Sequence, residues 1–490
     1  MSLTYKFRLV ASILYELSVA LVKLPGLLFS GWPLLKSTTV HEKEIAEVAR
    51  QVKEAYVNKK QIVLHRKPGH GHSARSSEYK RGHYGVDVAK LDSILVIEAE
   101  NQTVTVQAGV SFETLCAATL EYGLLPVVVP EFKRITVGGA IQGIGIESSS
   151  WKNGAVDEGV IEATLILGDG TIVSSEEVPD LWSHVPGSNG SLALVVAATL
   201  RLRAASKFIR VQYRLFDGLP DFLEVLEKNV CQFTRSMVLG MFAGCIATRD
   251  EGDSCGPLYQ EDAFSPFFFQ HIEEIVHRKL SSQDIKKVTN REYAEHMPTM
   301  QYLFRYDRGG FWGIMALGHM LSPLKFVLDR PLLTGVLNHF LTTSTLYKVA
   351  MLLSDLERES AGMLQDVDVP ASKADLVVQW AMEHHIDYLW LCPVKNGSSS
   401  IFSVSGAQEW VLNIGLYGVV DGLPDANKAL QRLVADCGGK TALYAHIYVT
   451  AEEFWTWYDR PTYDALRQDY HGAAFLDLFK KVGGISSQIT

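Results

Sequence analysis

The sequence predicts an α+β protein in which two domains are docked against each other. The chain has 490 residues, which is longer than a domain with a single hydrophobic core usually is. Between about residues 40 and 205, short strand patterns alternate with helical patterns, as in a mixed domain of this class. Beyond residue 207 the strand patterns are separated by long, aromatic-rich helical stretches. Because no low-complexity linker lies between the two parts, we expect them to pack tightly.

Composition excludes several classes of protein. Hydrophobic residues make up 47% of the chain and charged residues 21%, which excludes a disordered or fibrous protein. The net charge of -9 argues against a nucleic-acid partner, because binding to a phosphate backbone needs a basic surface. The six cysteines are far apart and form no CxxC pair. We therefore predict a reduced protein with no disulfide and no metal site.

Residues 1–38 are predicted to associate with a membrane. The apolar run Leu9 to Val22 contains Glu16 and is followed by Lys23, and two prolines interrupt the next apolar run, Leu24 to Leu35. This pattern favours an amphipathic helix that lies in one leaflet over a clean spanning helix. A transmembrane helix with Glu16 paired, or a helix packed on the protein's own surface, are the alternatives. A signal peptide is not predicted, because the small-residue cleavage site that it needs is not apparent before Lys23.

Local patterns define the elements of the first domain. Ile45, Val48 and Val52 recur at helical spacing, and Asp169-Gly170 separates two apolar runs as in a β-hairpin. In chain order we predict a helix at 41–58, a strand at 61–64, paired strands at 94–98 and 103–108, a helix at 112–122 capped by Ser111, and a hairpin of 160–167 with 171–174. A further apolar run at 192–202 closes this half. In the second half we predict strands at 208–216, 237–246, 389–393, 410–415 and 442–449, and a long helical stretch at 321–353.

Two glycine-rich turns are the main functional signal. The segment from Thr136 to Ser150 has four glycines within eight positions, which allows backbone N–H groups to approach a diphosphate closely. It is neither a phosphate-binding loop of the Gly-Lys-Ser/Thr type nor a dinucleotide fingerprint. The alternative is tight backbone packing without a ligand. A second glycine turn, Pro68 to Ser73, follows a predicted strand. Two such turns facing one diphosphate suit a flavin dinucleotide.

The order of these motifs resembles a known family. Pro68 to Ser73, then Val104 to Gly109, then Thr136-Val-Gly-Gly, then Leu167 to Gly170 resembles the two-subdomain FAD-binding domain of the vanillyl-alcohol-oxidase type, also called PCMH-type. Within that superfamily, Gly145-Ile-Glu-Ser-Ser-Ser150 is similar to the delta-24-sterol reductases (Diminuto/24-dehydrocholesterol reductase). Later blocks resemble the same family over nearly the whole chain, namely Arg305-Tyr-Asp-Arg308, Trp390-Leu-Cys-Pro393, Ile414 to Gly418, and Tyr444 through Phe454-Trp455.

The resemblance implies a domain plan and an activity. Residues 39–206 would form the FAD-binding domain, 207–460 an α+β substrate-binding cap domain, and 461–490 a C-terminal segment packed back on the FAD domain. With FAD bound and NADPH as electron donor, the expected reaction is reduction of the side-chain double bond of a desmosterol-like sterol. The expected location is the endoplasmic reticulum membrane, with the catalytic domain facing the cytosol. The oligomeric state is not predicted.

The resemblance also implies cofactor-binding positions. Glu147 either caps a turn or contacts FAD. The expected FAD-binding residues are Pro68, Gly69, His70, Gly71, His72, Ser73, Pro130, Thr136, Val137, Gly138, Gly139, Gly143, Gly145, Glu147, Ser148, Ser149 and Gly154.

Alkene reduction needs a hydride at one carbon and a proton at the other. Candidate acids are Tyr417, Tyr444 and His446, with Tyr448 alternating on the same predicted strand. The alternative is that they are half-buried sheet residues with satisfied hydroxyls. Arg308 is a further catalytic candidate, which either contacts the cofactor or pairs with a nearby acid.

One feature favours a different activity. Gly69-His70-Gly71-His72-Ser73 resembles the turn that carries a histidyl-flavin link in oxidase branches of the superfamily, with His72 as the attachment residue. An FAD-linked oxidase or dehydrogenase of another lipid, a terpenoid or a polyol is therefore an alternative. A non-catalytic sterol-binding protein with the same fold is the third hypothesis.

Overall fold

The computed structural model describes most of the chain from Ser37 onward. The described residues are 37–67, 78–215, 224, 236–238, 243–249, 257–262, 265–280, 292–314, 341–351, 362–386, 388–397, 400–404, 410–420 and 422–483. The predicted membrane segment and the turn Pro68 to Ser73 lie outside them. Within the described part, no helix combines the length and the apolar character that crossing a bilayer requires.

The first half of the chain is built on a sheet whose strands are ordered β3-β4-β8-β6-β7, with β5 paired to β8. These strands are β3 (Ile94–Glu98), β4 (Thr103–Gln107), β5 (Leu124–Pro126), β6 (Val160–Ile166), β7 (Ile172–Ser174) and β8 (Leu194–Ala204). A separate parallel pair consists of β1 (Ile62–His65) and β2 (Tyr84–Asp87). Helix α2 (Thr38–Val57) packs Ile45, Val48 and Val52 into a core shared with this pair.

The local predictions for this half are confirmed. β3 and β4 pair antiparallel, and α3 (Phe112–Leu120) begins at Ser111, whose side chain accepts a hydrogen bond from the N–H of Thr114. β6 and β7 form the expected hairpin, and Gly170 at its turn has a φ of 88°, which favours glycine. The short helices of this half are η1 (Glu78–Lys80), α4 (Val137–Gln142), α5 (Ser150–Asn153), η2 (Val156–Gly159) and α6 (Pro179–Trp182).

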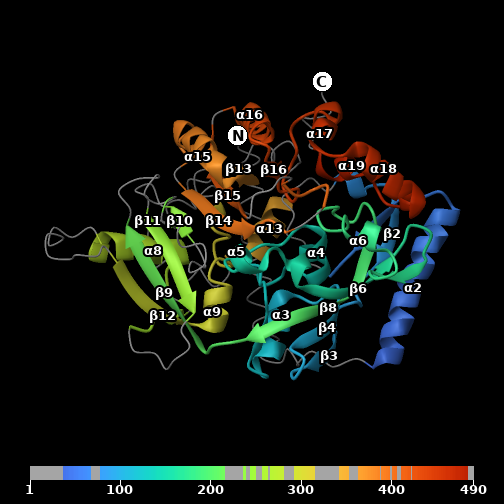
Figure 1. Ribbon diagram of the computed structural model, residues 1–490, viewed down its shortest axis with the longest axis horizontal. Helices are drawn as coiled ribbons and strands as arrows, with labels where there is room; N and C mark the ends of the chain where they lie inside the picture. Colours follow the sequence, from blue (N-terminus) through green and yellow to red (C-terminus); the bar gives the residue numbers. More distant parts are fainter. Residues whose placement is uncertain are drawn as a thin grey trace.

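The second half contains two more sheets (Figure 1). The smaller has the order β11-β9-β12, from β9 (Phe208–Leu215), β11 (Ala243–Arg249) and β12 (Glu292–Pro298), and lies near α8 (Phe268–Ile275), η3 (Val276–Leu280) and α9 (Thr299–Leu303). The larger, called the cap sheet below, has the order β10-β14-β15-β13-β16. Its strands are β10 (Ser236–Val238), β13 (Met363–Pro370), β14 (Tyr388–Lys395), β15 (Trp410–Gly418) and β16 (Lys440–Thr441).

The two faces of β13 have different environments. Val367 and Val369 are fully buried among residues of α15 (Ala374–Glu383) and α16 (Leu423–Asp436), which cover one face of the cap sheet. Asp366 and Asp368 alternate with them and therefore project from the opposite face. The remaining helices of this half are α13 (Thr343–Met351), η5 (Ala371–Lys373), α17 (Ala451–Trp457), α18 (Arg460–Asp469), η6 (Gly472–Ala474) and α19 (Leu478–Val482).

Two strand predictions in this half are wrong. The run 237–246 does not form one strand, because β10 joins the cap sheet while β11 pairs with β9 in the smaller sheet. The run 442–449 is irregular, apart from a single bridge between Ile447 and Gly483. Side-chain amides replace the missing ladder: Gln365 and Gln431 donate to the carbonyl of His446, and Gln431 accepts from the N–H of Tyr448. Of the predicted helical stretch 321–353, α13 is the described part.

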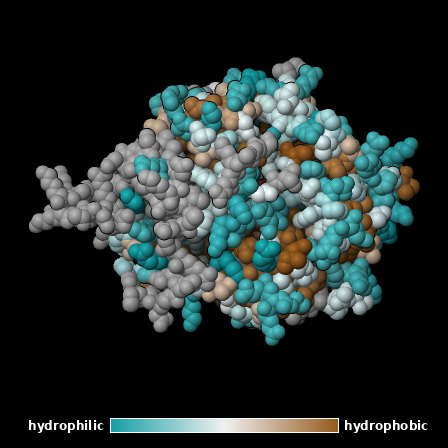
Figure 2. All heavy atoms as spheres, in the orientation of Figure 1, coloured by the Kyte–Doolittle hydropathy of each residue, from teal (hydrophilic) through white to brown (hydrophobic). Residues whose placement is uncertain are grey.

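The C-terminal segment contacts the first half of the chain, where Figure 1 draws α17 to α19 in red near α6 and α2. Arg467 donates to the carbonyl of Ser191, and Lys481 donates to the carbonyls of Asn189 and Gly190. The N–H of Gly168 donates to the carbonyl of Tyr470. Over the coloured part of the face shown in Figure 2, hydrophilic residues surround smaller groups of hydrophobic residues.

Candidate active site

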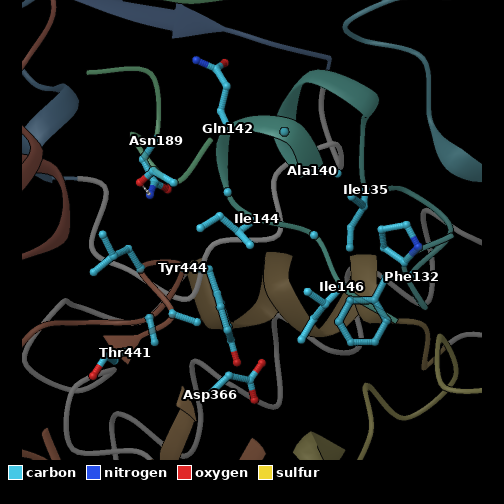
Figure 3. Close-up of a pocket in the computed structure, with 18 of the residues that line it drawn as sticks. Phe132, Ile135, Ala140, Gln142, Ile144, Ile146, Asn189, Asp366, Thr441 and Tyr444 are labelled. Carbon is cyan, nitrogen blue, oxygen red and sulfur yellow. Dashed lines mark hydrogen bonds between the residues drawn. The ribbon is translucent and has the colours of Figure 1, made fainter. Parts of the chain in front are cut away.

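A large cavity lies where the glycine-rich segment faces the cap sheet. Its volume is about 840 Å³, which is within the range of about 300–1,000 Å³ usual for ligand pockets. One wall comes from Thr136 and the residues that follow it, and the other from β13, β15 and the irregular segment around Tyr444. Figure 3 shows Ile144, Ile146 and Phe132 on one side of this space, with Tyr444 and Asp366 opposite.

The glycine-rich segment combines packing and exposure. The N–H of Gly138 donates to the carbonyl of Ala108 at 2.8 Å, and a methyl group on Gly138 would lie 2.6 Å from the Ala108 side chain. Val137 is fully buried. These two residues therefore dock α4 on the end of β4, as the packing hypothesis expected, and neither lines the large cavity.

Beyond α4, the segment presents backbone to the cavity. Gly139, Gly143 and Gly145 line it, together with Pro130 and Thr136. The side chain of Thr136 caps α4 by accepting from the N–H of Gly139. Within the described residues, the N–H groups of Ile144 and Ile146 have no hydrogen-bond acceptor. These donors are available to a ligand with acceptor atoms.

Four predicted cofactor residues are engaged within the protein and do not line the cavity. The Ser149 hydroxyl donates to the carbonyl of Val127 at 2.8 Å, and the Ser148 hydroxyl donates to the carboxylate of Glu147. The N–H of Glu147 donates to the Ser150 hydroxyl, so Glu147 stabilises the turn, the simpler of its two predicted roles. Gly154 has a φ of 69° and ends α5. The residues of the glycine-rich segment are thus divided between structural roles and cavity lining.

Arg66 is a cavity residue that the motif analysis missed. It follows β1 directly and lines the cavity with Lys67. Lys67 forms an ion pair with Asp92, whereas Arg66 forms no ion pair or hydrogen bond within the described part of the chain. The accessible surface of Arg66 classes it as exposed, so its guanidinium can be reached by a ligand. An accessible guanidinium that lines a cavity, with no counter-ion among the described residues, can bind an anionic ligand.

The catalytic candidates separate into two groups. Tyr417, Tyr444 and His446 line the cavity, as does Tyr448. Arg308 does not, because its guanidinium pairs with Glu261 at 3.1 Å near the smaller sheet. Of the four cavity residues, Tyr417, His446 and Tyr448 are at most 5% exposed, whereas Tyr444 has appreciable exposed surface. Tyr444 is therefore the candidate whose side chain is open to a ligand.

Asp366 joins two of these tyrosines. The Tyr417 hydroxyl donates to Asp366 at 3.2 Å, and the Tyr444 hydroxyl is hydrogen-bonded to the same carboxyl group. Figure 3 shows the Tyr444 hydroxyl pointing toward Asp366. Asp368, two residues along the same face of β13, accepts from the amide of Asn413 at 2.8 Å. The cavity thus contains a half-buried acid with two phenols around it.

Burial controls the ionisation of this group. Burial first, and then the charge of Asp368, raise the pKa of Asp366 to about 7, against hydrogen bonds from Tyr417 and Tyr444 that lower it. Burial also raises the pKa of Asp368 to about 6. The pKa values of Tyr417 and Tyr444 are raised well above their usual range by burial and by Asp366. At neutral pH, Asp366 is therefore close to half protonated, and both phenols carry their protons.

Two sequence comparisons show which known proteins the chain resembles. Residues 38–176 match the model of the FAD binding domain family. The chain is 26% identical over 464 residues to the Delta(24)-sterol reductase of Homo sapiens, which covers 89% of this chain and 86% of the relative. It is 27% identical over 479 residues to the enzyme of that name from Mus musculus, covering 92% and 89%. The corresponding Arabidopsis thaliana protein is 24% identical over 509 residues, covering 90% and 84%.

The chain is similar to the delta(24)-sterol reductases over about nine-tenths of its length. This confirms the resemblance inferred from the sequence motifs, and together with the matched FAD domain it supports an FAD-dependent oxidoreductase. The cavity fits this cofactor, since among the described residues nothing pairs with the Arg66 guanidinium or with the N–H groups of Ile144 and Ile146, which lie beside an apolar wall. We expect these groups to hold FAD.

Replacing Arg66 by glutamine is expected to weaken FAD binding about 10-fold or more, because a charge-assisted hydrogen bond contributes roughly 1.5–3 kcal/mol. Quenching of FAD fluorescence during titration of the deflavinated protein measures the dissociation constant. Lys152→Gln, on the exposed surface of α5, is the matched control with unchanged affinity. Equal affinity of Arg66→Gln and the unchanged protein would contradict this assignment.

Proposed function

We propose that the protein reduces the side-chain delta-24 double bond of a desmosterol-like sterol, with FAD as cofactor and NADPH as electron donor. The proposal is supported by the names of relatives that align over about nine-tenths of the chain. The observation that carries it is the cavity, in which Tyr444 and Asp366 face the apolar end of the glycine-rich segment. We further propose that the N-terminal segment attaches the protein to the endoplasmic reticulum membrane, from which a sterol would be collected.

The lining of the cavity suits a lipid substrate. Ile135, Ile144 and Ile146 from the first half line the cavity, and so do Leu364 and Val411 from the cap sheet. Desolvation of a hydrocarbon substrate against such walls is favourable by about 25 cal/mol per Å² of apolar surface. The walls would also exclude water, so that a proton reaches the substrate from a positioned side chain.

In the mechanism we propose, bound FAD in its reduced form supplies a hydride to one carbon of the double bond. Tyr444 supplies the proton to the other carbon, because it is the least buried residue among the candidate acids that line the cavity. Tyr417 is stacked on Phe311, with ring centroids 5.5 Å apart, and donates to Asp366, so it fixes the carboxyl group. His446 is held through its backbone by two glutamines and shapes the wall.

The test is an anaerobic stopped-flow experiment on the purified flavoprotein. NADPH is expected to bleach the flavin absorbance, and desmosterol is expected to restore it. If NADPH leaves the flavin oxidised, the proposed donor is wrong; if desmosterol leaves it reduced, the proposed substrate is wrong. Oxygen consumption with a lipid alcohol in the absence of NADPH, and flavin that stays on the protein after acid precipitation, would instead support the oxidase linked at His72.

A further inference from the structure

Asp366 is a carboxyl group to which neither the sequence motifs nor the comparisons assign a role. It lies on the cavity face of β13, where it contacts the hydroxyls of both Tyr417 and Tyr444. A buried carboxyl group with nothing but a structural role is usually paired with a cation. Here the charged groups that act on it most strongly are Asp368 and Glu131, both of them acids. The surroundings therefore favour its protonated form.

The protonation state of Asp366 decides which way the Tyr444 hydroxyl points. A carboxylate has only acceptor oxygens, so it draws the O–H of Tyr444 toward itself and away from a substrate. A protonated carboxyl group can instead donate its own hydrogen to the Tyr444 oxygen. The Tyr444 O–H, which is also within hydrogen-bonding reach of the Tyr417 hydroxyl, can then turn from Asp366 into the cavity. One proton on Asp366 thus reverses the hydrogen bond between the two residues.

We propose that Asp366 is a positioning residue that, when protonated, directs the Tyr444 hydroxyl at the alkene and afterwards restores its proton. This inference rests on the proposed reductase function. The Tyr444 O–H bond breaks as a C–H bond forms on the substrate, while the hydride completes the two-electron reduction of the double bond and NADPH is the reductant consumed. The phenolate that remains takes the proton of Asp366, and the resulting carboxylate regains a proton from solvent. No charge accumulates in the cavity over one turnover.

The surrounding groups come from every element packed on Asp366. They are Asp368 on its own strand, Asn413 and Tyr417 on β15, Tyr347 on α13, Tyr444 and His446 on the irregular segment, and Glu131 before α4. Tyr347 has a pKa raised mainly by burial, so it stays neutral and does not titrate near pH 7. Asp368 has a pKa raised to about 6 and is the neighbour that must be tested separately.

The predicted pH dependence follows from the sign of the Asp366 shift. Its pKa is raised to about 7, so the active, protonated form is present below that pH and is lost above it. The rate at which the substrate reoxidises the flavin should therefore fall about 100-fold between pH 6 and pH 9, one decade per unit above the pKa. In Asp366→Asn, the amide donates permanently to the Tyr444 oxygen. That variant should keep a rate within roughly tenfold of the pH 6 value and lose this pH dependence.

Two further measurements separate this role from a structural one. Asp368→Asn keeps Asp366 and should retain the inflection, although its midpoint should fall because a neighbouring negative charge has been removed. Infrared difference spectroscopy of the protein without sterol should show the carbonyl band of a protonated carboxyl group that disappears near pH 7. The Asp366 component of this band should be present in Asp368→Asn and missing in Asp366→Asn, where the component of Asp157, another acid whose pKa is raised to about 7, remains.

Several outcomes would overturn the proposal. One is an inflection that persists in Asp366→Asn; another is a flat profile in the unchanged protein. If Asp366→Asn does not fold, the infrared titration of the unchanged protein and of Asp368→Asn still tests the proposal. Absence of the band in both proteins would mean that Asp366 is ionised throughout, which contradicts the proposal. The infrared test needs neither NADPH nor sterol. Its failure is therefore distinct from failure of the proposed reductase activity, which the stopped-flow experiment detects.

Discussion

Replacing Tyr444 by phenylalanine is expected to slow reoxidation of the reduced flavin by desmosterol about 100- to 10,000-fold, the usual range for loss of a general acid. Tyr444 combines a partly exposed side chain that lines the cavity with a hydrogen bond to the carboxyl group of Asp366. Phenylalanine retains the ring and removes only the proton donor. Reduction of the flavin by NADPH should be unchanged, because that step needs no proton from Tyr444. Single-turnover stopped-flow absorbance measures the two steps separately.

A matched control is available in the cap sheet. Tyr388 on β14 does not line the cavity, and its hydroxyl donates to Glu273 at 3.3 Å. Tyr388→Phe makes the same chemical change and should leave the reoxidation rate within about threefold. A Tyr444→Phe protein that reacts as fast as Tyr388→Phe would rule out Tyr444 as the donor, and Tyr417→Phe would then be the next variant to measure.

Gly168→Ala is expected to cause the largest loss of stability. A methyl group at this position would collide with the backbone carbonyl oxygen of His471, which cannot move aside as a flexible side chain does. Overpacking usually costs about 1–3 kcal/mol, and we expect the upper end or more here because the obstacle is backbone. The hairpin of β6 and β7 would separate from the segment between α18 and η6. Thermal unfolding and cleavage of the C-terminal segment by a protease report this change.

Gly418→Ala serves as the comparison for that variant. Its added methyl group would have no neighbour closer than 3.7 Å and meets the side chain of Ile386 at an ordinary distance. It should therefore unfold at nearly the temperature of the unchanged protein. Because Lys481 lines the cavity and donates to Asn189 and Gly190, the Gly168→Ala protein should also bind FAD more weakly. Equal protease resistance of the two variants would refute the importance of this contact.

Local sequence patterns predicted the elements of the first half well, because each has its own signal. Ser111 caps α3, and glycine at position 170 allows the hairpin turn. The segment around Tyr444 was predicted as a strand from alternating tyrosines and histidine. Its actual path depends on Gln365 and Gln431, which are distant in sequence, so no local pattern could reveal it.

The cavity shows the same difference between local and distant information. The glycine-rich segment was found as a cavity wall, since glycines in close succession are visible in the sequence. Arg66 and Asp366 were missed, although the alternation of acidic and apolar residues in Gln365-Asp366-Val367-Asp368-Val369 is a strand pattern with a carboxyl on every second position. Only the pairing of β13 with β15 brings Asp366 beside Tyr417.

Because β13 carries valines on one face and aspartates on the other, the chemistry of the cavity depends on the register between β13 and β15. Val367 pairs with Ile414, and Asp366 with Gly415, in the antiparallel ladder to β15. A slip of one residue would turn Val367 into the cavity and place both carboxyl groups against α15 and α16, in a hydrophobic core. The cost of burying those acids is a penalty against the misaligned strand. Asp366, which we propose for proton transfer, and its neighbour Asp368 thus also favour the correct register of β13 when the cap sheet folds.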